Sequence, residues 1–320
     1  MARALKPGLP PHPVLAALIE PELRAPVAHE LTVFAERLAA RAAAGVAAIL
    51  FYGSGLREQA LDTLLDFYVL VDRAGAWPQG WFAAVANRVL PPNVGYAEEA
   101  IAGRTLRAKY AVMTTAQFRR AMAARSLDTT LWTRFSQPCA CVYARSDADR
   151  NQVLGAVCSA AMAGGYWAAV LGPERGEPAA YWSALYARTY ELELRVESAS
   201  RSDAVVARAR ERYARLLPAS WQAAGVAFEE HPGELRPMLA GRARADGLHR
   251  WARRRRLGRP LNVLRLLKAA FTFDRPLDYV VWKVERHSGV RLAIAPWERR
   301  FPLLAAPGVY YRLRRRGLLR

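Results

Sequence analysis

The sequence predicts an α+β fold: a mixed β-sheet with flanking helices, followed by a mainly helical second domain and a basic C-terminal region. Up to about residue 146, short apolar runs typical of strands alternate with apolar residues at helical spacing. Beyond that point almost all of the spacing is helical, and arginines accumulate toward the C-terminus. We therefore expect three parts, residues 1–148, 149–245 and 246–320.

The first part is expected to alternate between helix and strand. Residues 26–44 carry Leu31, Phe34, Ala35 and Leu38 on one helical face. The other expected elements are strands at 46–52, 66–72, 107–114 and 138–144, a helix with Trp81, Phe82, Val85 and Val89 on one face, and a helix at 116–124.

The second part is expected to begin at a helix N-terminal signal between Ser146 and Asp149. A charged helix at 201–217 follows later, and a strand pattern returns only at 279–284. A further helix between these points should place five residues on one face: Trp182, Leu185, Tyr186, Thr189 and Val196.

A glycine-serine turn, Gly53-Ser54-Gly55, lies between the first two expected strands. Glycine lets the main chain approach a ligand closely, so the N–H groups of such a turn can face phosphate oxygens, and Ser54 adds a hydroxyl. The second strand has a carboxylate at each end, Asp66 and Asp72. Carboxylates combined with phosphate oxygens are the ligands that Mg²⁺ prefers, so this stretch predicts a site for a nucleoside triphosphate with Mg²⁺.

The two carboxylates differ in how well they fit this role. Residues two apart in a strand share a face, so Asp66, Tyr68 and Asp72 point the same way. A straight strand would hold Asp66 and Asp72 roughly 20 Å apart, too far to share one ion. Either the strand bends after Val69, or Asp72 has another part, such as capping the next turn. Asp66 is the stronger candidate.

The same stretch resembles the signature of the nucleotidyltransferase superfamily, which pairs a Gly-Ser turn with an acidic residue in the next strand. That signature usually has a second acid two residues after the first, where this chain has Tyr68. The sequence is more similar to the mitochondrial-type (Tam41-like) phosphatidate cytidylyltransferases. Two more segments in the order of that family support the resemblance, Lys109–Val112 and Leu131–Pro138, although Gln137 replaces a lysine of the family pattern.

This resemblance covers roughly residues 45–145 and implies a nucleotidyltransferase-like first domain. It implies an enzyme that uses CTP, Mg²⁺ and phosphatidic acid to make CDP-diacylglycerol and pyrophosphate. Applied residue by residue, it implies catalytic roles for Asp66 and Lys109 and metal binding by Asp66 and Asp72. The nucleotide-binding residues that it implies are Gly53, Ser54, Gly55, Arg57 and Arg134.

The net charge of +19 indicates an anionic partner. Only four of the 47 basic residues are lysine, and the arginines cluster at 250–259 and 310–320 among aromatic and apolar residues. A mostly apolar helix is expected between them, at 261–273. Three interpretations compete: a solvated basic surface, an RNA-binding surface, and contact with an anionic membrane. We favour the membrane over nucleic acid, and expect a cytoplasmic protein peripheral to the inner face of the membrane.

The cysteines and the N-terminus narrow the remaining classes of protein. With only Cys139, Cys141 and Cys158, the chain lacks the cysteine pairs of a zinc site, and we expect buried, inert thiols in a reducing compartment. Residues 1–13 resemble neither a signal peptide nor a transit peptide. No run reaches the ~20 uninterrupted apolar residues of a membrane span.

Two alternatives to a lipid cytidylyltransferase stay open. One is a nucleotidyltransferase that acts on RNA or on a soluble substrate. The other is a non-catalytic RNA-binding or membrane-binding protein on a degenerate nucleotidyltransferase scaffold, which Tyr68 in place of the second acid would suggest.

Overall fold

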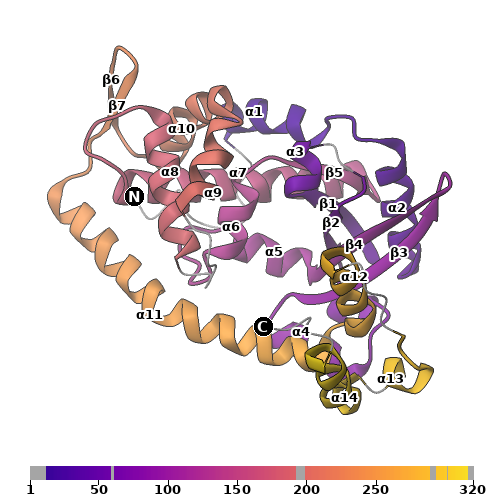
Figure 1. Ribbon diagram of the computed structural model, residues 1–320. Helices are drawn as coiled ribbons and strands as arrows, with labels where there is room; N and C mark the ends of the chain where they lie inside the picture. The colour runs from indigo at the N-terminus through magenta and orange to yellow at the C-terminus, as the bar shows by residue number, and fades with distance from the viewer. Residues whose placement is uncertain (1–11, 59–60, 192–198, 289–292, 301, 316–320) are drawn as a thin grey trace.

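The computed structural model describes residues 12–58, 61–191, 199–288, 293–300 and 302–315 (Figure 1). In this part of the chain the order of elements is α1 (Pro13–Leu23), α2 (His29–Ala40), η2 (Ala43–Gly45), β1 (Val46–Tyr52), α3 (Ser54–Glu58), β2 (Leu64–Val71), η3 (Ala74–Ala76), α4 (Trp81–Val89), β3 (Asn93–Ile101), β4 (Arg104–Thr114), α5 (Thr115–Ala121), α6 (Thr130–Phe135), β5 (Cys139–Ala144), α7 (Asp147–Leu171), α8 (Pro178–Tyr190), α9 (Ala199–Ala207), α10 (Arg210–Ala224), β6 (Phe228–His231), β7 (Glu234–Pro237), α11 (Gly241–Thr272), α12 (Pro276–Ser288), α13 (Pro296–Arg300) and α14 (Pro302–Arg315).

The α+β prediction is confirmed at the level of architecture. A five-stranded mixed sheet has the order β3-β4-β2-β1-β5, and a mainly helical region follows it. Only β2 and β4 pair in parallel; the other neighbours are antiparallel. The parallel pair requires a crossover, which α4 and β3 supply between the two strands.

The two faces of the sheet pack into different cores, as the period of two along a strand requires. On β2, Phe67 and Val69 point to the face covered by α2, where the Phe67 ring stacks on Phe34 with centroids 5.4 Å apart. Tyr68 and Leu70 point to the other face and join a second core with α1, α6 and α7. Several helices border this second face, and the candidate site forms on it.

The helical region is built around α7, which the other helices enclose (Figure 1). Ser146 caps this helix, its hydroxyl accepting a hydrogen bond of 3.1 Å from the Asp149 N–H, as expected. By length and composition α7 could cross a membrane, with a mean hydropathy of 1.5 over its best window, but 83% of that window is buried inside the protein. Apolar contacts with the sheet and with α8 and α10 explain its composition.

One core joins the sheet to the helical region. The buried cluster on the α7 side contains residues of β1, β2 and β4 together with residues of α7, α8 and α10. The expected change of pattern near residue 148 is present as the start of α7, but the two parts on either side of it share their apolar interior.

Long helix α11 connects the far end of the helical region to the sheet (Figure 1). Near its start, Arg244 donates a 2.9 Å hydrogen bond to the Gly172 carbonyl oxygen. Just after its end, the Asp274 carboxylate accepts a 2.6 Å hydrogen bond from Tyr110 of β4, and the Asp274 N–H donates to Val94 of β3 at 3.1 Å. The helix is therefore held at both ends and passes alongside the sheet face between them.

The expected strand at 279–284 is wrong, because α12 covers these residues. The run is rich in valine, which suggested a strand, yet its apolar residues also repeat at helical spacing. Leu277, Val280, Val281 and Val284 all pack in a small core together with Ile294, Ala305 and Val309. This tertiary packing decides the conformation.

Several other elements differ from the expectation. Helix α1, strand β3 and the β6–β7 hairpin were not predicted, because they are short or weakly patterned. The charged helix expected at 201–217 is divided between α9 and α10. Val196, expected on the face of α8, lies outside the described residues.

We predict opposite effects of two glycine-to-alanine substitutions in α7. A Cβ at Gly165 would lie 2.4 Å from the Ser220 Cβ of α10, so Gly165→Ala should destabilise the protein by about 1–3 kcal/mol. A Cβ at Gly155 meets nothing within 4 Å, so Gly155→Ala should stabilise it by roughly 0.5–1 kcal/mol. Denaturant unfolding measures both. Equal effects would contradict the close packing of α7 on α10.

Candidate nucleotide site

A cavity of 680 Å³ lies over the α7-side face of the sheet, below α6 and α11. It brings together five of the predicted site residues, although they come from four separate segments of the chain: Gly53, Ser54, Asp66, Lys109 and Arg134. At this position side chains of β2 and β4 line a space that can hold a ligand.

The floor of the cavity is formed by neighbouring strands in register. Asp66 of β2 is the register partner of Lys109 on parallel β4 and of Tyr52 on antiparallel β1. Register partners on adjacent strands lie about 5 Å apart and point to the same face. A half-buried carboxylate and a half-buried ammonium group therefore stand side by side at the base of the cavity.

The Gly-Ser turn lies directly against Asp66. Gly53 has a φ of +92°, a conformation that L side chains rarely adopt, and a Cβ at this position would lie 3.1 Å from the Asp66 Oδ2 atom. The turn thus needs glycine for two independent reasons. The close approach leaves the main chain at Gly53 beside the carboxylate, and Ser54 also lines the cavity.

Arg134 of α6 is oriented by two tyrosines. Its Nη1 donates a 2.9 Å hydrogen bond to the Tyr68 hydroxyl, and its guanidinium lies 5.1 Å from the centroid of the Tyr52 ring. Tyr68 is only 2% exposed, and burial raises the pKa of its hydroxyl. Tyr68 is therefore a neutral acceptor for Arg134 and not an anionic substitute for the missing second acid.

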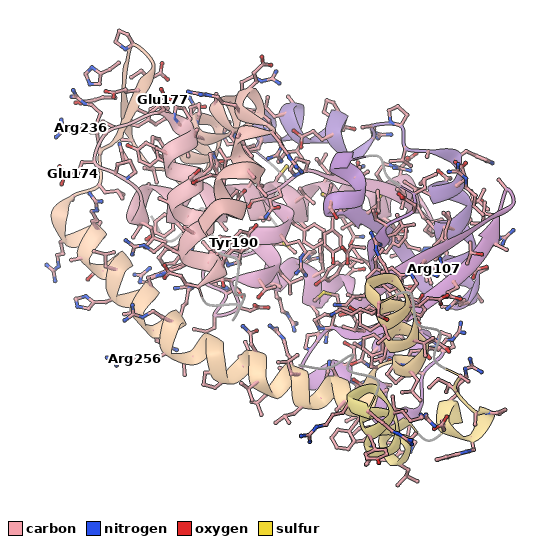
Figure 2. All side chains as sticks on the ribbon, viewed as in Figure 1. Arg107, Glu174, Glu177, Tyr190, Arg236 and Arg256 are labelled. Carbon is pink, nitrogen blue, oxygen red and sulfur yellow. The ribbon has the colours of Figure 1, made fainter. Side chains whose placement is uncertain are left out.

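The opposite wall contains residues that the sequence analysis missed. Arg265 of α11 forms a salt bridge of 2.8 Å with Asp128, which precedes α6, and both side chains are mostly buried. Asn262 of α11 and Tyr190 of α8 also line the cavity. Figure 2 shows Tyr190 at the end of α8, in the centre of the molecule. The arginine cluster nearby suggested only a basic surface, and nothing local in the sequence links Arg265 with Asp128, which lies 137 positions earlier.

Two predicted residues, Gly55 and Asp72, do not line the cavity. Gly55 lies beneath the turn, where a Cβ would contact Phe51 and Leu65. The side chain of Arg57 lies outside what the structure describes.

The position of Asp72 corrects its predicted role as a second metal ligand beside Asp66, because it lies away from the cavity. At the far end of β2 its two oxygens accept hydrogen bonds of 2.6 and 3.1 Å from Arg145, which also binds Asp149 of α7. These hydrogen bonds raise the pKa of the Arg145 guanidinium. Asp72 links the end of the sheet to the start of α7 and does not line the cavity that contains Asp66, because β2 pairs with β4 without a break from Leu64 to Val71 and separates the two carboxylates.

The residues of the cavity suit Mg²⁺ only when the ion binds together with a phosphorylated ligand. Among the described residues, no group of three or more His, Cys, Asp or Glu side chains could hold a metal ion. The carboxylates that line the cavity are Asp66 and Asp128, and Arg265 already pairs with the second. One carboxylate fits Mg²⁺ when phosphate oxygens and water complete its shell, so Asp66 beside Gly53 and Ser54 suits a metal that arrives with a phosphorylated ligand.

The cysteines lie outside this chemistry. All three are free and buried, as expected, and burial raises the pKa of each thiol, that of Cys158 to about 12. None of them lines the cavity.

No protein-family model matches the chain, and no curated protein shows significant similarity to it. The resemblance to the phosphatidate cytidylyltransferases therefore depends on the quoted residues alone. The cavity adds an observation of its own, because it places the residues that the resemblance names beside Asp128, Tyr190 and Arg265, which the resemblance does not name.

We predict that Gly53→Ala weakens the binding of magnesium pyrophosphate by about tenfold or more. A Cβ at this φ is strained and presses on Asp66, so the turn must move away from the phosphate position. The matched control is Gly75→Ala, where a Cβ meets nothing within 4 Å. Isothermal titration measures both, and an unchanged affinity of Gly53→Ala would remove the turn from the site.

Proposed function

We propose that this protein is a Mg²⁺-dependent nucleotidyltransferase that makes CDP-diacylglycerol from CTP and phosphatidic acid. The observation that carries the proposal is the convergence of the Gly53-Ser54 turn, Asp66, Lys109 and Arg134 on one cavity. A triphosphate needs main-chain donors, cations and a metal-binding carboxylate within reach of one another, and this cavity supplies all three.

The proposed reaction is an in-line displacement. An oxygen of the phosphatidate phosphate attacks the α-phosphorus of CTP, a new P–O–P bond forms, and the bond to the β-phosphate breaks to release pyrophosphate. Lys109 and Arg134 would hold the triphosphate and balance the charge that moves onto the leaving group. Mg²⁺ bound by Asp66 and phosphate oxygens would supply further charge neutralisation.

No general base is needed in this scheme. A phosphate monoester is already anionic at neutral pH, so the nucleophile needs no proton removed before it attacks. The contribution of the protein is mainly the positioning of two phosphorylated substrates. This suits a cavity in which Asp66 stands next to a lysine and Tyr68 is neutral.

An exposed apolar surface supports a lipid substrate. Helix α4 buries the polar side chain of Asn87, which donates a 3.1 Å hydrogen bond to the Val112 carbonyl oxygen, and exposes its apolar face. The apolar face that the sequence predicted for this helix therefore faces solvent instead of the core. The exposed residues are Trp81, Phe82, Val85 and Val89 of α4, and Val263, Leu264, Leu266, Leu267 and Phe271 of α11. We call these nine residues the α4–α11 apolar surface.

The two helices of this surface are held together. Lys268 of α11 donates hydrogen bonds of 2.6 and 2.5 Å to the carbonyl oxygens of Leu90 and Pro92, just after α4, and Arg265 donates to Pro91 at 3.1 Å. The first half of α11 carries exposed arginines, among them Arg256, which points away from the protein in Figure 2. Apolar side chains beside arginines are the combination that suits an anionic bilayer surface.

The location follows from the same proposal. The protein would act as a peripheral protein on the inner, cytoplasmic face of a membrane, with the α4–α11 apolar surface in the headgroup region. Leu266 belongs to this surface and also lines the candidate cavity, so the cavity and the bilayer would be adjacent.

One observation favours a second candidate. With Tyr68 neutral and Asp128 paired, Asp66 has no free carboxylate beside it in the described cavity. A site with one available carboxylate is expected in a non-catalytic binding protein on a nucleotidyltransferase scaffold. It is also expected in a transferase that acts on RNA or on a soluble substrate, if the metal binds together with the nucleotide.

The deciding measurement is pyrophosphate release from the full chain with Mg²⁺ and CTP, with and without phosphatidic acid vesicles. We expect release that requires both CTP and phosphatidic acid, and a loss of about 10³-fold or more in Asp66→Asn, because the carboxylate that binds the metal is removed. The control Asp62→Asn alters an exposed aspartate of the preceding loop and should retain activity.

Three results would overturn the proposal. High activity of Asp66→Asn would remove the metal site. Release that ignores lipid but requires RNA or a soluble acceptor would favour the broader transferase class. No release with CTP, ATP, GTP or UTP, together with intact binding to vesicles, would favour the non-catalytic protein.

We also predict that removing two exposed aromatic side chains, by Trp81→Ala with Phe82→Ala, reduces binding to phosphatidic acid vesicles by about tenfold or more. Burial of these side chains in the headgroup region would be lost, while the fold should keep its stability because both are exposed. The control is Val14→Ala with Met238→Ala, two exposed apolar residues outside this surface. Vesicle flotation measures both, and equal effects would exclude the α4–α11 apolar surface.

A further inference from the structure

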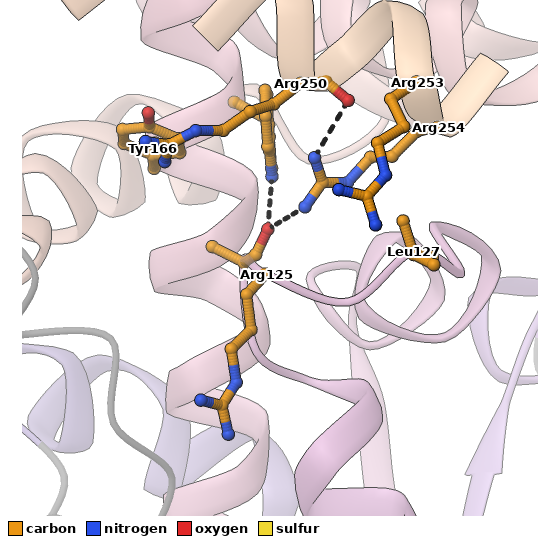
Figure 3. A pocket seen from close by; sticks show the side chains of 8 residues that line it. Arg125, Leu127, Tyr166, Arg250, Arg253 and Arg254 are labelled. Atoms are coloured by element: carbon orange, nitrogen blue, oxygen red, sulfur yellow. Dashed lines mark hydrogen bonds between the residues drawn. The ribbon is translucent and has the colours of Figure 1, made fainter. Parts of the chain in front are cut away.

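A second cavity, of 490 Å³, lies between α7 and the first half of α11. Four arginines line it: Arg125 from the loop after α5, and Arg250, Arg253 and Arg254 from α11. Figure 3 shows the three α11 arginines on one side and, opposite them, the loop that carries Arg125, whose side chain points away from them. The walls also include the aromatic side chains of Tyr166 and Trp167.

Arg254 is the unusual member of this group. It is only 4% exposed, and it donates hydrogen bonds to the carbonyl oxygens of Ala124, Ser126 and Arg250 at 2.6, 2.9 and 3.2 Å. Its guanidinium lies 4.3 Å from the centroid of the Trp167 ring. Carbonyl groups and an aromatic face fix its position, but none of these partners carries a negative charge.

The charge of this cluster is not balanced by the described part of the chain. No carboxylate there forms a salt bridge with any of the four arginines. Burial, together with the charges of the neighbouring Arg250 and Arg253, lowers the pKa of Arg254 to about 10. Placing like charges around a buried guanidinium costs free energy, which an anion in the cavity would offset.

The residue types indicate which anion fits. Guanidinium groups match phosphate oxygens with paired N–H donors, and several of them around one cavity favour a doubly charged group. The volume exceeds what a phosphate ion alone requires, and the aromatic walls offer contact to an organic group attached to it. We propose that this cavity binds a phosphate monoester, carried either by a lipid headgroup or by a small soluble molecule.

This site is separate from the candidate nucleotide site. On α11 the two cavities are lined by Arg254 and Arg265, which are about 16 Å apart along a helix that rises 1.5 Å per residue. One phosphate cannot occupy both. The loop after α5 runs between them, because Leu127 lines the arginine cavity and Asp128 lines the other. The proposal does not depend on the nucleotidyltransferase reaction.

The test is titration of the full chain, without nucleotide or metal, with inorganic phosphate and with glycerol 3-phosphate. In parallel, flotation uses phosphatidylcholine vesicles that contain phosphatidic acid or, at equal surface charge, phosphatidylserine. We expect Arg250→Ala with Arg253→Ala to weaken binding in at least one arm by about tenfold. The matched control is Arg255→Ala with Arg256→Ala, which removes the same charge from exposed positions of the same helix outside the cavity. It should change binding less than about twofold.

The titrations, the flotation assays and the two double variants together distinguish a soluble ligand, a lipid headgroup and general charge attraction. Binding of the soluble esters assigns a soluble ligand, and a preference for phosphatidic acid over phosphatidylserine vesicles assigns a lipid headgroup. Equal losses in the two double variants would show only general charge attraction and overturn the proposal, as would absence of binding in every arm. Arg253→Glu is a second variant at an exposed position and should abolish binding with an unchanged melting temperature.

Failure of this proposal is distinguishable from failure of the proposed function. The double variant retains Asp66, Lys109 and Arg134, so binding of magnesium pyrophosphate at the candidate nucleotide site should persist when the arginine cavity is altered.

Discussion

The parallel pairing of β2 with β4 is the interaction on which the rest of the structure depends. It sets Asp66 next to Lys109 and requires the chain to cross over through α4 and β3 before it can return. The crossover places α4 against α11, and α4 exposes its apolar side chains there. The polar floor of the candidate cavity and the apolar surface beside it are thus consequences of the same strand order.

Much of the first part could be predicted from the sequence because its signals are local. The Gly53-Ser54 turn, the alternation in β2 and the Lys109 strand each depend on a few neighbouring residues, and the structure brings them to one cavity. Arg134 was predicted from a resemblance, but its orientation by Tyr52 and Tyr68 depends on the packing of α6 over the sheet. The roles of these residues stay predictions until activity is measured.

What the sequence could not predict depends on contacts between distant segments. Asp72 is the same residue type as Asp66 and was expected on the same face of the strand. The two differ in their surroundings, because Asp72 forms an ion pair with Arg145 at the far end of the strand. The Asp128–Arg265 pair joins residues that no local pattern connects, and valines at 280, 281 and 284 fit a strand or a helix equally until Ile294 and Val309 are packed against them. Arginines in a run gave no indication that Arg254 would be buried on Trp167.

The attachment of α11 at its two ends has a mechanical consequence. A helix of 32 residues is about 48 Å long and is much stiffer than a loop of the same number of residues. Arg244 attaches one end to the helical region and Asp274 attaches the other to the sheet, so a displacement of α11 as one rigid body would move a wall of each cavity. Occupancy of one cavity would then change the width of the other.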